Sequence, residues 1–361
     1  MLKLRYKIIG ERMKIIINGR FLTQNITGVQ RFAHEIVNKL DKFMKKDEIV
    51  ILVPKNLLFK NLKYENIEIK KIGFLRGYLW EQLELPYYVW KTQGRLVNLC
   101  NTAPIINTGI VIIHDISTKV NSKFYSKKFS IFYNILNKII TKTSIKILTV
   151  SEFSKKEIMK YYNINSSKID IVYNAWQHME RIIEDRKILE KLRLKNKKFY
   201  LGVSSINPNK NFKYIIELAK LYPEKIFVIV GKLNQKVFGN MNLEKIDNIV
   251  WAGYITDEEL KALYKNTLGF IYPSFYEGFG IPPMEALACG CKKVYVSDTS
   301  CLPEIFEDSV IYLNPYKVEK ILNEREAIKE ESIKKVLNKY SWEKSIKTII
   351  NIINDSIFKE K

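Results

Sequence analysis

Two glutamates that flank a glycine-rich turn are the residues of this sequence best suited to bind a ligand. Residues 272–290 read YPSFYEGFGIPPMEALACG, with Glu277 at the end of an expected strand and Glu285 eight residues later. Carboxylate oxygens accept hydrogen bonds from paired hydroxyl groups such as those of a sugar. We expect a helix to open at the two prolines and to carry Glu285 in its first turn, where the helix dipole stabilises an anion.

The turn between the two glutamates carries two glycines. Gly278 and Gly280 let the backbone approach a ligand closely because they have no side chain. Backbone amides here and at the start of the helix would point outward, toward hydroxyl or phosphate oxygens. One glutamate alone would indicate an ordinary helix cap, whereas two around Gly-Phe-Gly-Ile-Pro-Pro indicate a binding site.

Residues 277–285 resemble the paired-glutamate motif of the retaining glycosyltransferases of family 4, and the resemblance extends over nearly the whole chain. It implies the two-domain GT-B fold, in which the C-terminal domain binds a nucleotide-sugar donor. By this resemblance Glu285 binds the ribose hydroxyls and Glu277 contacts the transferred sugar, which the amides of Phe279 and Gly280 help to hold.

A second loop agrees with this motif. Residues 202–211 (GVSSINPNKN) lie between an expected strand and an expected helix, and resemble the family's loop for the donor diphosphate. Lys210 matches the lysine that neutralises the leaving phosphates, where a positive charge stabilises the bond-breaking transition state more than the ground state. Several relatives carry an arginine where this sequence has Ser204 and Ser205, so here Ser205 only donates a hydrogen bond and Lys210 supplies the charge.

The turn at residues 251–256 (WAGYIT) meets the nucleotide base in relatives, which implicates Gly253, Tyr254 and Ile255. Thr256 and Glu259 also form a capping-box pattern, so a purely structural turn between strand and helix explains the segment almost as well.

The N-terminal half has signals of its own. Residues 19–31 resemble the family's glycine loop near phosphates and acceptor; Gly28 is expected to begin a helix, and the dinucleotide spacing GxGxxG is absent. His114 ends the run IVIIH and matches the family's histidine, so we expect it to contact the sugar or the reaction centre, with Asp115 beside it on the acceptor side.

Two further segments recur in relatives. Residues 151–154 (SEFS) match the family or act only as a helix cap. Residues 80–82 (WEQ) and 85–86 (LP) are interpreted as structural or as facing the acceptor.

Short β-branched runs alternate with helical patterns along the chain, which indicates parallel sheets covered by helices. The expected strands are 14–17, 49–53, 96–99, 110–113, 146–150 and 169–173, then 199–203, 226–230, 249–251, 268–272 and 293–296. The expected helices include 29–42, 80–91, 152–161, 212–220, 256–265 and 283–288, with further helices in 316–339.

The pattern occurs twice, so the sequence predicts an α/β protein with two doubly wound, Rossmann-like domains facing a cleft. We expect an acceptor-side domain over residues 1–178, with 1–12 as an extension, and a nucleotide-sugar-binding domain over 179–340. Residues 341–361 are expected to form a helix that packs back across the junction.

The composition is that of a globular protein, and no apolar run approaches the ~18 residues needed to cross a bilayer. The N-terminus lacks the features of a secretory signal. The four cysteines form no CxxC pair, so we expect reduced thiols in a cytoplasmic protein.

The net charge of +22 rests on lysine, which supplies 50 of the 60 basic residues. Specific nucleic-acid readers depend on arginine, so we expect no nucleic-acid partner. The lysine excess reflects either genome composition or attraction to an anionic membrane. Residues 119–168 hold eleven lysines and two glutamates. The helix expected at 127–143 could lie on a membrane surface at the inner face of the cytoplasmic membrane, or pack as an ordinary core helix.

The sequence contains no Asp-x-Asp pair for a divalent metal, so we expect no metal and no cofactor. The resemblance implies a retaining transfer from a GDP-mannose-like or UDP-sugar donor to a glycan or lipid-linked acceptor, in assembly of surface polysaccharide or lipopolysaccharide. It does not imply that Glu277 is a covalent nucleophile. The alternatives are a non-catalytic relative that binds a sugar nucleotide, a sugar-nucleotide epimerase of the same fold and, from charge alone, a nucleic-acid-binding protein.

Overall fold

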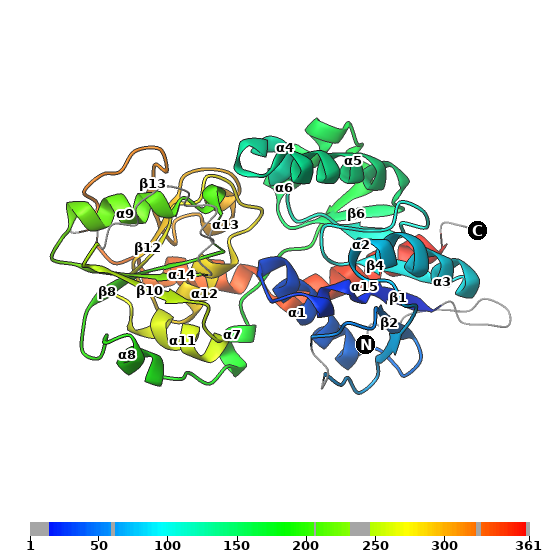
Figure 1. Cartoon of the computed structure of the whole chain (residues 1–361), viewed down its shortest axis with the longest axis horizontal. Helices are drawn as coiled ribbons and strands as arrows, with labels where there is room; N and C mark the ends of the chain where they lie inside the picture. Colours follow the sequence, from blue (N-terminus) through cyan, green and yellow to red (C-terminus); the bar gives the residue numbers. More distant parts are fainter. Residues whose placement is uncertain (1–13, 59–61, 206, 232–245, 323–325, 359–361) are drawn as a thin grey trace. The chain divides into compact units, whose positions relative to one another are not determined.

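The computed structural model describes residues 14–58, 62–205, 207–231, 246–322 and 326–358. The expected extension at residues 1–12 lies outside these ranges. The chain forms two compact units (Figure 1). The first contains the chain up to Asn174 and again from Trp342 onward, and the second is Ala175–Ser341. The sequence predicted these boundaries after residues 178 and 340.

The first unit is built on a seven-stranded sheet with all strands parallel. Its strands are β1 (Ile15–Asn18), β2 (Ile49–Val53), β3 (Glu68–Lys71), β4 (Arg95–Asn98), β5 (Ile110–Ile112), β6 (Lys146–Thr149) and β7 (Ile169–Ile171). They follow the order β3-β2-β1-β4-β5-β6-β7. Strands β1, β2 and β5 are buried along their whole length, which explains their unbroken apolar runs.

Helices flank this sheet. They are α1 (Gly28–Phe43), α2 (Gly77–Leu79), α3 (Leu85–Thr92), α4 (Ser117–Val120), α5 (Lys127–Thr143), α6 (Glu152–Tyr162) and α15 (Trp342–Phe358), with a π-helical turn (Trp80–Glu84) between α2 and α3. One core cluster packs Ile140 of α5 and Ile158 of α6 on Ile147 of β6. Another packs Trp80 and Leu85 on strands β1, β2 and β4.

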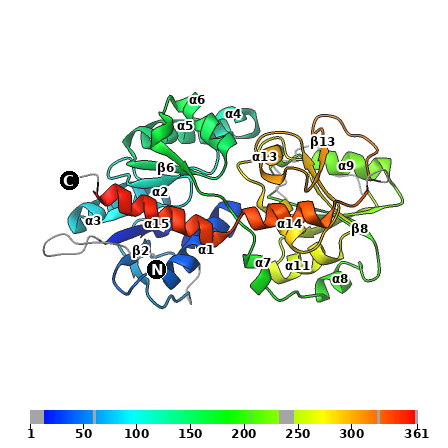
Figure 2. The ribbon, with the colours of Figure 1, turned by 180° about the vertical axis from the view of Figure 1, so that it is seen from behind.

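The final helix, α15, belongs to the first unit although it follows the second unit along the chain. Figure 2 shows it in red beside α1, and the rings of Trp342 and Phe32 are 5.9 Å apart. The hydroxyl of Ser345 donates to the carbonyl of Tyr173 at 2.6 Å. The start of α15 is therefore fixed to the segment at which the chain first leaves this unit.

The second unit is built on a six-stranded parallel sheet. Its strands are β8 (Phe199–Val203), β9 (Ile226–Val230), β10 (Ile249–Gly253), β11 (Gly269–Tyr272), β12 (Val294–Ser297) and β13 (Ile311–Leu313), in the order β10-β9-β8-β11-β12-β13. Its helices are α7 (His178–Arg181), α8 (Lys187–Lys191), α9 (Phe212–Leu221), α11 (Asp257–Asn266), α12 (Ile281–Ala288), α13 (Leu302–Phe306) and α14 (Glu330–Lys339). In Figure 1, α9 lies on one side of the sheet and α11 on the other.

The predicted fold class, two doubly wound parallel sheets, is confirmed. Two short strands were missed: β3 is a largely exposed edge strand with two lysines, and β13 has three residues. Residues 316–339, expected to be helical, form a described helix only from Glu330 onward.

Among the described strands, the order reverses between β1 and β4 in the first sheet and between β8 and β11 in the second. The connections that leave the carboxyl ends of such a pair run to opposite faces of the sheet, and the crevice between them is where doubly wound proteins bind ligands.

Candidate active site

Lys210 and Glu277 meet at the reversal point of the second sheet. Lys210 closes the 3-10 turn (Pro208–Lys210) that follows β8, and Glu277 follows β11. The Nζ of Lys210 lies 2.6 Å from Oε1 of Glu277, in a pair that is largely buried but not sealed from solvent. The structure therefore brings together the two second-unit residues for which the sequence predicted a catalytic role, at the position where a ligand is expected.

The loops that carry this pair are joined by amide side chains. Asn207 caps the turn, since its Oδ1 accepts from the amide of Asn209 at 2.9 Å. The side-chain amide of Asn209 donates to the carbonyl of Tyr276 at 2.7 Å, and the main-chain carbonyl of Asn209 accepts from the amide of Phe275 at 2.9 Å. Asn211, with φ +53°, donates to the carbonyl of Pro273 at 3.1 Å. These bonds fix the β8 loop against the β11 loop.

Tyr272, the last residue of β11, lies beneath the pair. Lys210 approaches its hydroxyl at 3.5 Å. Burial, with the nearby Glu277 carboxylate, raises the pKa of Tyr272 well above that of a free phenol. The phenol therefore stays neutral and adds no charge to the site.

Glu285 occupies a different position from the one expected. Helix α12 begins at Ile281, so Glu285 lies in its second turn and not in its first, where the N-terminal dipole acts most strongly. Its carboxylate is held instead by two side chains: Nε2 of His178 is 2.7 Å from Oε1, and the hydroxyl of Tyr264 donates to Oε2 at 2.9 Å. Burial and the Glu285 carboxylate raise the pKa of Tyr264, so its phenol keeps the proton that it donates.

The turn between the two glutamates depends on glycine. Gly280 adopts φ +93° as the N-cap of α12, and a Cβ there would lie 2.8 Å from Leu302 Cδ2. The amide of Glu277 donates to Ser300 Oγ at 3.0 Å, and the ring of Phe279 packs edge-on against Tyr340 at 5.2 Å. Gly278 is buried in the same turn. Ser300, just before α13, and Tyr340, near the end of the second unit, therefore hold the turn in place.

The turn proposed for the nucleotide base lies at the carboxyl end of β10. Gly253 has φ +70° with open space where a Cβ would stand, Tyr254 is 69% exposed and Ile255 is buried. The capping box that the sequence predicts is present, since Thr256 Oγ1 accepts from the amide of Glu259 and the Glu259 carboxylate accepts from the amide of Thr256. Ser205, in the β8 loop, is exposed.

His114 lies in the first unit, just beyond the carboxyl end of β5. Its Nε2 is 3.0 Å from the carbonyl oxygen of Leu99. Because a carbonyl only accepts, Nε2 carries the hydrogen. Burial lowers the pKa of His114, so the ring is neutral near pH 7 and its Nδ1 is an acceptor.

The other residues expected on the first unit have clear local roles. Asp115 Oδ1 accepts from the amide of Ser117 at 2.8 Å at the start of α4. Gly28 is the first residue of α1, as predicted. Ser151 caps α6 through the amide of Ser154 at 3.1 Å, which confirms the capping interpretation of this segment.

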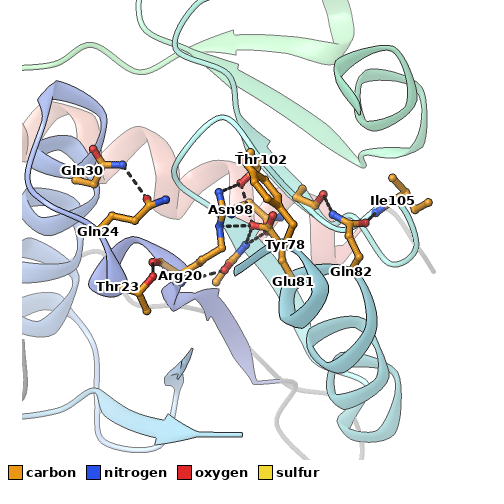
Figure 3. A network of polar contacts seen from close by, with 12 residues as sticks. Arg20, Thr23, Gln24, Gln30, Tyr78, Glu81, Gln82, Asn98, Thr102 and Ile105 are labelled. Carbon is orange, nitrogen blue, oxygen red and sulfur yellow. Dashed lines mark hydrogen bonds and ion pairs between the residues drawn. The ribbon is translucent and has the colours of Figure 1, made fainter. Parts of the chain in front are cut away.

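A polar network fills the reversal point of the first sheet (Figure 3). Glu81, fully buried in the π-helical turn, accepts at Oε1 from Asn18 at 2.8 Å and from Thr102 at 2.9 Å. Arg20 Nε lies 3.3 Å from the same oxygen, and its guanidinium stacks over the ring of Tyr78 at 4.1 Å. Glu81 of the WEQ segment therefore joins the helical connection to the end of β1 and to the loop that follows β4.

Sequence reasoning missed four residues that support the donor motif: His178, Tyr264, Tyr272 and Ser300. Tyr272 begins the motif itself and could have been found as the end of a strand. Tyr264 lies in the helix expected at residues 256–265, but a helical pattern does not single it out, and His178 and Ser300 belong to no motif. Only the folded chain brings these three residues to the glutamates and their turn.

Among the residues that the structure describes, no group of three or more His, Cys, Asp or Glu side chains could hold a metal ion. No helix in the described part of the chain has the length and apolarity needed to span a bilayer. The four cysteines, all in described segments, form no disulfide.

Comparisons with known proteins show which sequences and folds this chain is similar to. A family model described as "Glycosyl transferases group 1" matches residues 184–344. An O-antigen chain mannosyltransferase of Salmonella typhimurium is 26% identical over 83% of this chain and 87% of its own length. A Campylobacter jejuni N-acetylgalactosaminyltransferase, whose name specifies a diphospho-undecaprenol-linked sugar, is 30% identical over 45% of this chain and 44% of its own. The structure of Anabaena HepE in complex with UDP and glucose superposes with a TM-score of 0.70 at 16% identity, over 94% of this chain and 99% of HepE.

Proposed function

Because this chain is a group 1 glycosyltransferase with the GT-B fold, we propose that it moves a sugar from a nucleoside diphosphate to an acceptor hydroxyl with retention of the anomeric configuration. The observation that carries the proposal is the Lys210–Glu277 pair at the β8/β11 reversal point. It puts one cation and one carboxylate at the carboxyl ends of the two strands between which a ligand binds.

Lys210 is the group that neutralises the departing diphosphate. Its ammonium has three N–H donors, so while one contacts Oε1 of Glu277 another can reach a phosphate oxygen beside that carboxylate. Negative charge on the leaving group grows as its bond to the sugar breaks, so a fixed positive charge favours the transition state over the ground state.

Glu277 and Glu285 hold the two sugars of the donor. Glu277 contacts the transferred sugar and orients Lys210, while Glu285 accepts hydrogen bonds from the ribose hydroxyls. The turn of Gly278, Phe279 and Gly280 provides amides for the donor. Gly253, Tyr254 and Ile255 face the base, and Ser205 donates to the diphosphate.

The reaction needs no covalent sugar–enzyme intermediate. The acceptor oxygen forms its bond to the anomeric carbon on the face from which the diphosphate leaves, and the acceptor proton passes to a leaving phosphate oxygen. Glu277, engaged by Lys210, orients groups and does not attack. We propose that charge neutralisation by Lys210 and by backbone amides takes the place of a divalent metal.

The first unit supplies the acceptor side. His114, neutral and accepting at Nδ1, contacts the sugar or the reaction centre. Gly28 and Asp115 belong to the segments that lie near the phosphates and the acceptor. The mannosyltransferase relative and the HepE structure with UDP and glucose support a GDP-mannose-like or UDP-sugar donor. The relative named for a diphospho-undecaprenol-linked sugar supports a glycan or lipid-linked acceptor, in assembly of a surface polysaccharide such as lipopolysaccharide.

A surface of the first unit supports peripheral binding to an anionic membrane, at the inner face of the cytoplasmic membrane. Ile131 and Ile135 of α5 are 59% and 56% exposed, and Lys128, Lys138 and Lys142 flank them at helical spacing on the same face. A helix with exposed apolar residues between lysines suits the boundary between headgroups and acyl chains.

A hollow beside this face adds positive charge. Its volume is about 550 Å³, and its lining includes Lys119, Lys138 and Lys142 but no carboxylate. Such a lining suits a phosphate headgroup.

The test of the proposed reaction is acceptor-dependent release of nucleoside diphosphate from a panel of nucleotide-sugars, with a chelator present. We expect release by the wild type and a loss of about 10²–10³ in kcat for Lys210→Ala. Glu277→Ala should also lose activity, whereas Lys213→Ala, an exposed lysine of α9, should not. Donor conversion without any acceptor product would indicate an epimerase instead, and unchanged turnover in both site variants would refute the assignment.

A further inference from the structure

His178 is the first residue of α7 and is almost completely buried, with 1% of its surface exposed. In the sequence it follows shortly after the junction between Asn174 and Ala175, where the chain enters the second unit. Nothing in the sequence pattern singles it out. Its Nε2 nevertheless lies 2.7 Å from Oε1 of Glu285, 107 residues further along the chain.

The carboxylate of Glu285 is held at both oxygens. His178 donates to Oε1, and Tyr264 of α11 donates to Oε2 at 2.9 Å. Two donors on different oxygens fix the rotation of the carboxylate plane, which a single donor leaves adjustable. A carboxylate has about four acceptor positions, so two bonds to the protein are compatible with further bonds to ligand hydroxyls.

The segment that carries His178 is itself held on the second unit. Lys261 donates to the carbonyls of Met179 at 2.6 Å and Ile182 at 2.8 Å, at the end of α7. Trp176 donates from Nε1 to the carbonyl of Leu337 at 2.9 Å. Since these partners come from α11 and α14, the position of the His178 ring is set by the body of the unit and not by the short helix alone.

We propose that His178 is a positioning residue for the donor: it holds the Glu285 carboxylate in the orientation that accepts the ribose hydroxyls, with Tyr264 as the second support. The inference rests on the proposed contact between Glu285 and the ribose. It predicts that His178, which does not itself touch the nucleotide, determines how strongly the protein distinguishes ribose from deoxyribose.

The experiment compares the affinity of a ribonucleoside diphosphate with that of its 2′-deoxy counterpart by titration calorimetry, using UDP and dUDP or GDP and dGDP. The wild type should bind the ribonucleotide at least about tenfold more tightly, the effect of one hydrogen bond to a charged group. His178→Ala should remove most of this preference by weakening the binding of the ribonucleotide, with little change in the affinity for the deoxynucleotide. Tyr264→Phe should reduce the preference, and His178→Gln, which keeps a donor group, should restore part of it.

Two matched variants make the result specific. Glu285→Gln reports the contact itself, and Trp176→Phe removes another hydrogen bond of the same segment without touching Glu285. We expect the first to lose the preference and the second to keep it.

The possible outcomes separate the two claims. If the wild type and His178→Ala both prefer the ribonucleotide and Glu285→Gln does not, the role of His178 is refuted while the ribose contact stands. A wild type that binds both nucleotides equally refutes the ribose contact and this inference together, but leaves the role of Lys210 untouched. Should His178→Ala fail to fold, His178→Gln and Tyr264→Phe decide the question by the same comparison.

Discussion

The Nζ of Lys210 lies 2.6 Å from Oε1 of Glu277, although the two residues are 67 positions apart and follow different strands. The contact exists because β8 and β11 are neighbours at the place where the order of the described strands reverses in the second sheet. Each residue alone is an ordinary surface type, one of fifty lysines or one glutamate of a loop. Their meeting at a reversal point gives them a common role toward a ligand.

Gly280 and Gly290 offer a matched test of the donor turn. Both have strongly positive φ, +93° and +89°, but a Cβ would meet Leu302 and Phe306 only at Gly280 and has open space at Gly290. We expect Gly290→Ala to lower the free energy of unfolding by about 1 kcal/mol, for the left-handed backbone alone. Gly280→Ala should lose about 1–3 kcal/mol more, because the methyl group forces the buried side chains of Leu302 and Phe306 to shift. Urea unfolding of the two variants measures the difference, and equal losses would show that the turn is not tightly packed.

His34 should make the stability of the protein depend on pH. Burial, with the Arg31 charge as a smaller cause, lowers the pKa of His34 to about 4. The unfolded chain binds a proton there below pH 6.5 and the folded chain does not, so stability is full above that pH and falls as the pH drops toward 4. This one group should lower the free energy of unfolding by about 2 kcal/mol when the pH falls from 7.5 to 5.

The measurement is the urea midpoint of wild type and His34→Gln at both pH values. The variant should lose less stability on acidification than the wild type. Parallel losses would mean that the histidine does not titrate as its burial requires.

Arg20 and Glu81 should depend on each other for stability. The Glu81 side chain is fully buried and that of Arg20 is 8% exposed, so removing either one leaves the other charge buried without its partner. We expect Arg20→Met and Glu81→Leu each to cost about 3–5 kcal/mol, and the double variant to cost less than the sum. A thermodynamic cycle of the three variants measures this coupling, and strictly additive losses would argue against it.

The α5 surface predicts binding to anionic vesicles. Removal of two lysines near a membrane should weaken binding by about 2 kcal/mol, so Lys138→Glu with Lys142→Glu should reduce sedimentation with phosphatidylglycerol vesicles at least tenfold. The control is Lys213→Glu with Lys220→Glu, which changes the net charge equally on α9. An equal reduction by both pairs would show that total charge, and not this surface, governs binding.

Much of the fold could be predicted because its strands are buried. The runs at β2, β8 and β9 were predicted with the bounds observed, since strands covered on both faces consist of continuous apolar residues. Strand β3 escaped for the opposite reason: its Glu68, Lys70 and Lys71 point to solvent at the edge of the sheet, so its sequence resembles a loop.

The candidate site could be predicted only where its residues are close in sequence. Glu277, the glycines and Lys210 belong to local motifs, and the structure places the lysine and the glutamate in contact. The surroundings of Glu285 could not be foreseen, because the helix begins at Ile281, before the prolines, which puts Glu285 beyond the first turn. His178 and Tyr264 also reach it from other helices. Long-range side-chain contacts of this kind leave no periodic signal in a single sequence.

The central claim is that Lys210 binds the donor diphosphate at the β8/β11 reversal point. Titration calorimetry with a nucleoside diphosphate and the monophosphate of the same base tests it most directly, in wild type, Lys210→Ala and Lys213→Ala. If Lys210 binds the diphosphate, the wild type and Lys213→Ala should bind the diphosphate more tightly than the monophosphate, and Lys210→Ala should lose this preference. A preference that survives unchanged in Lys210→Ala would contradict the claim.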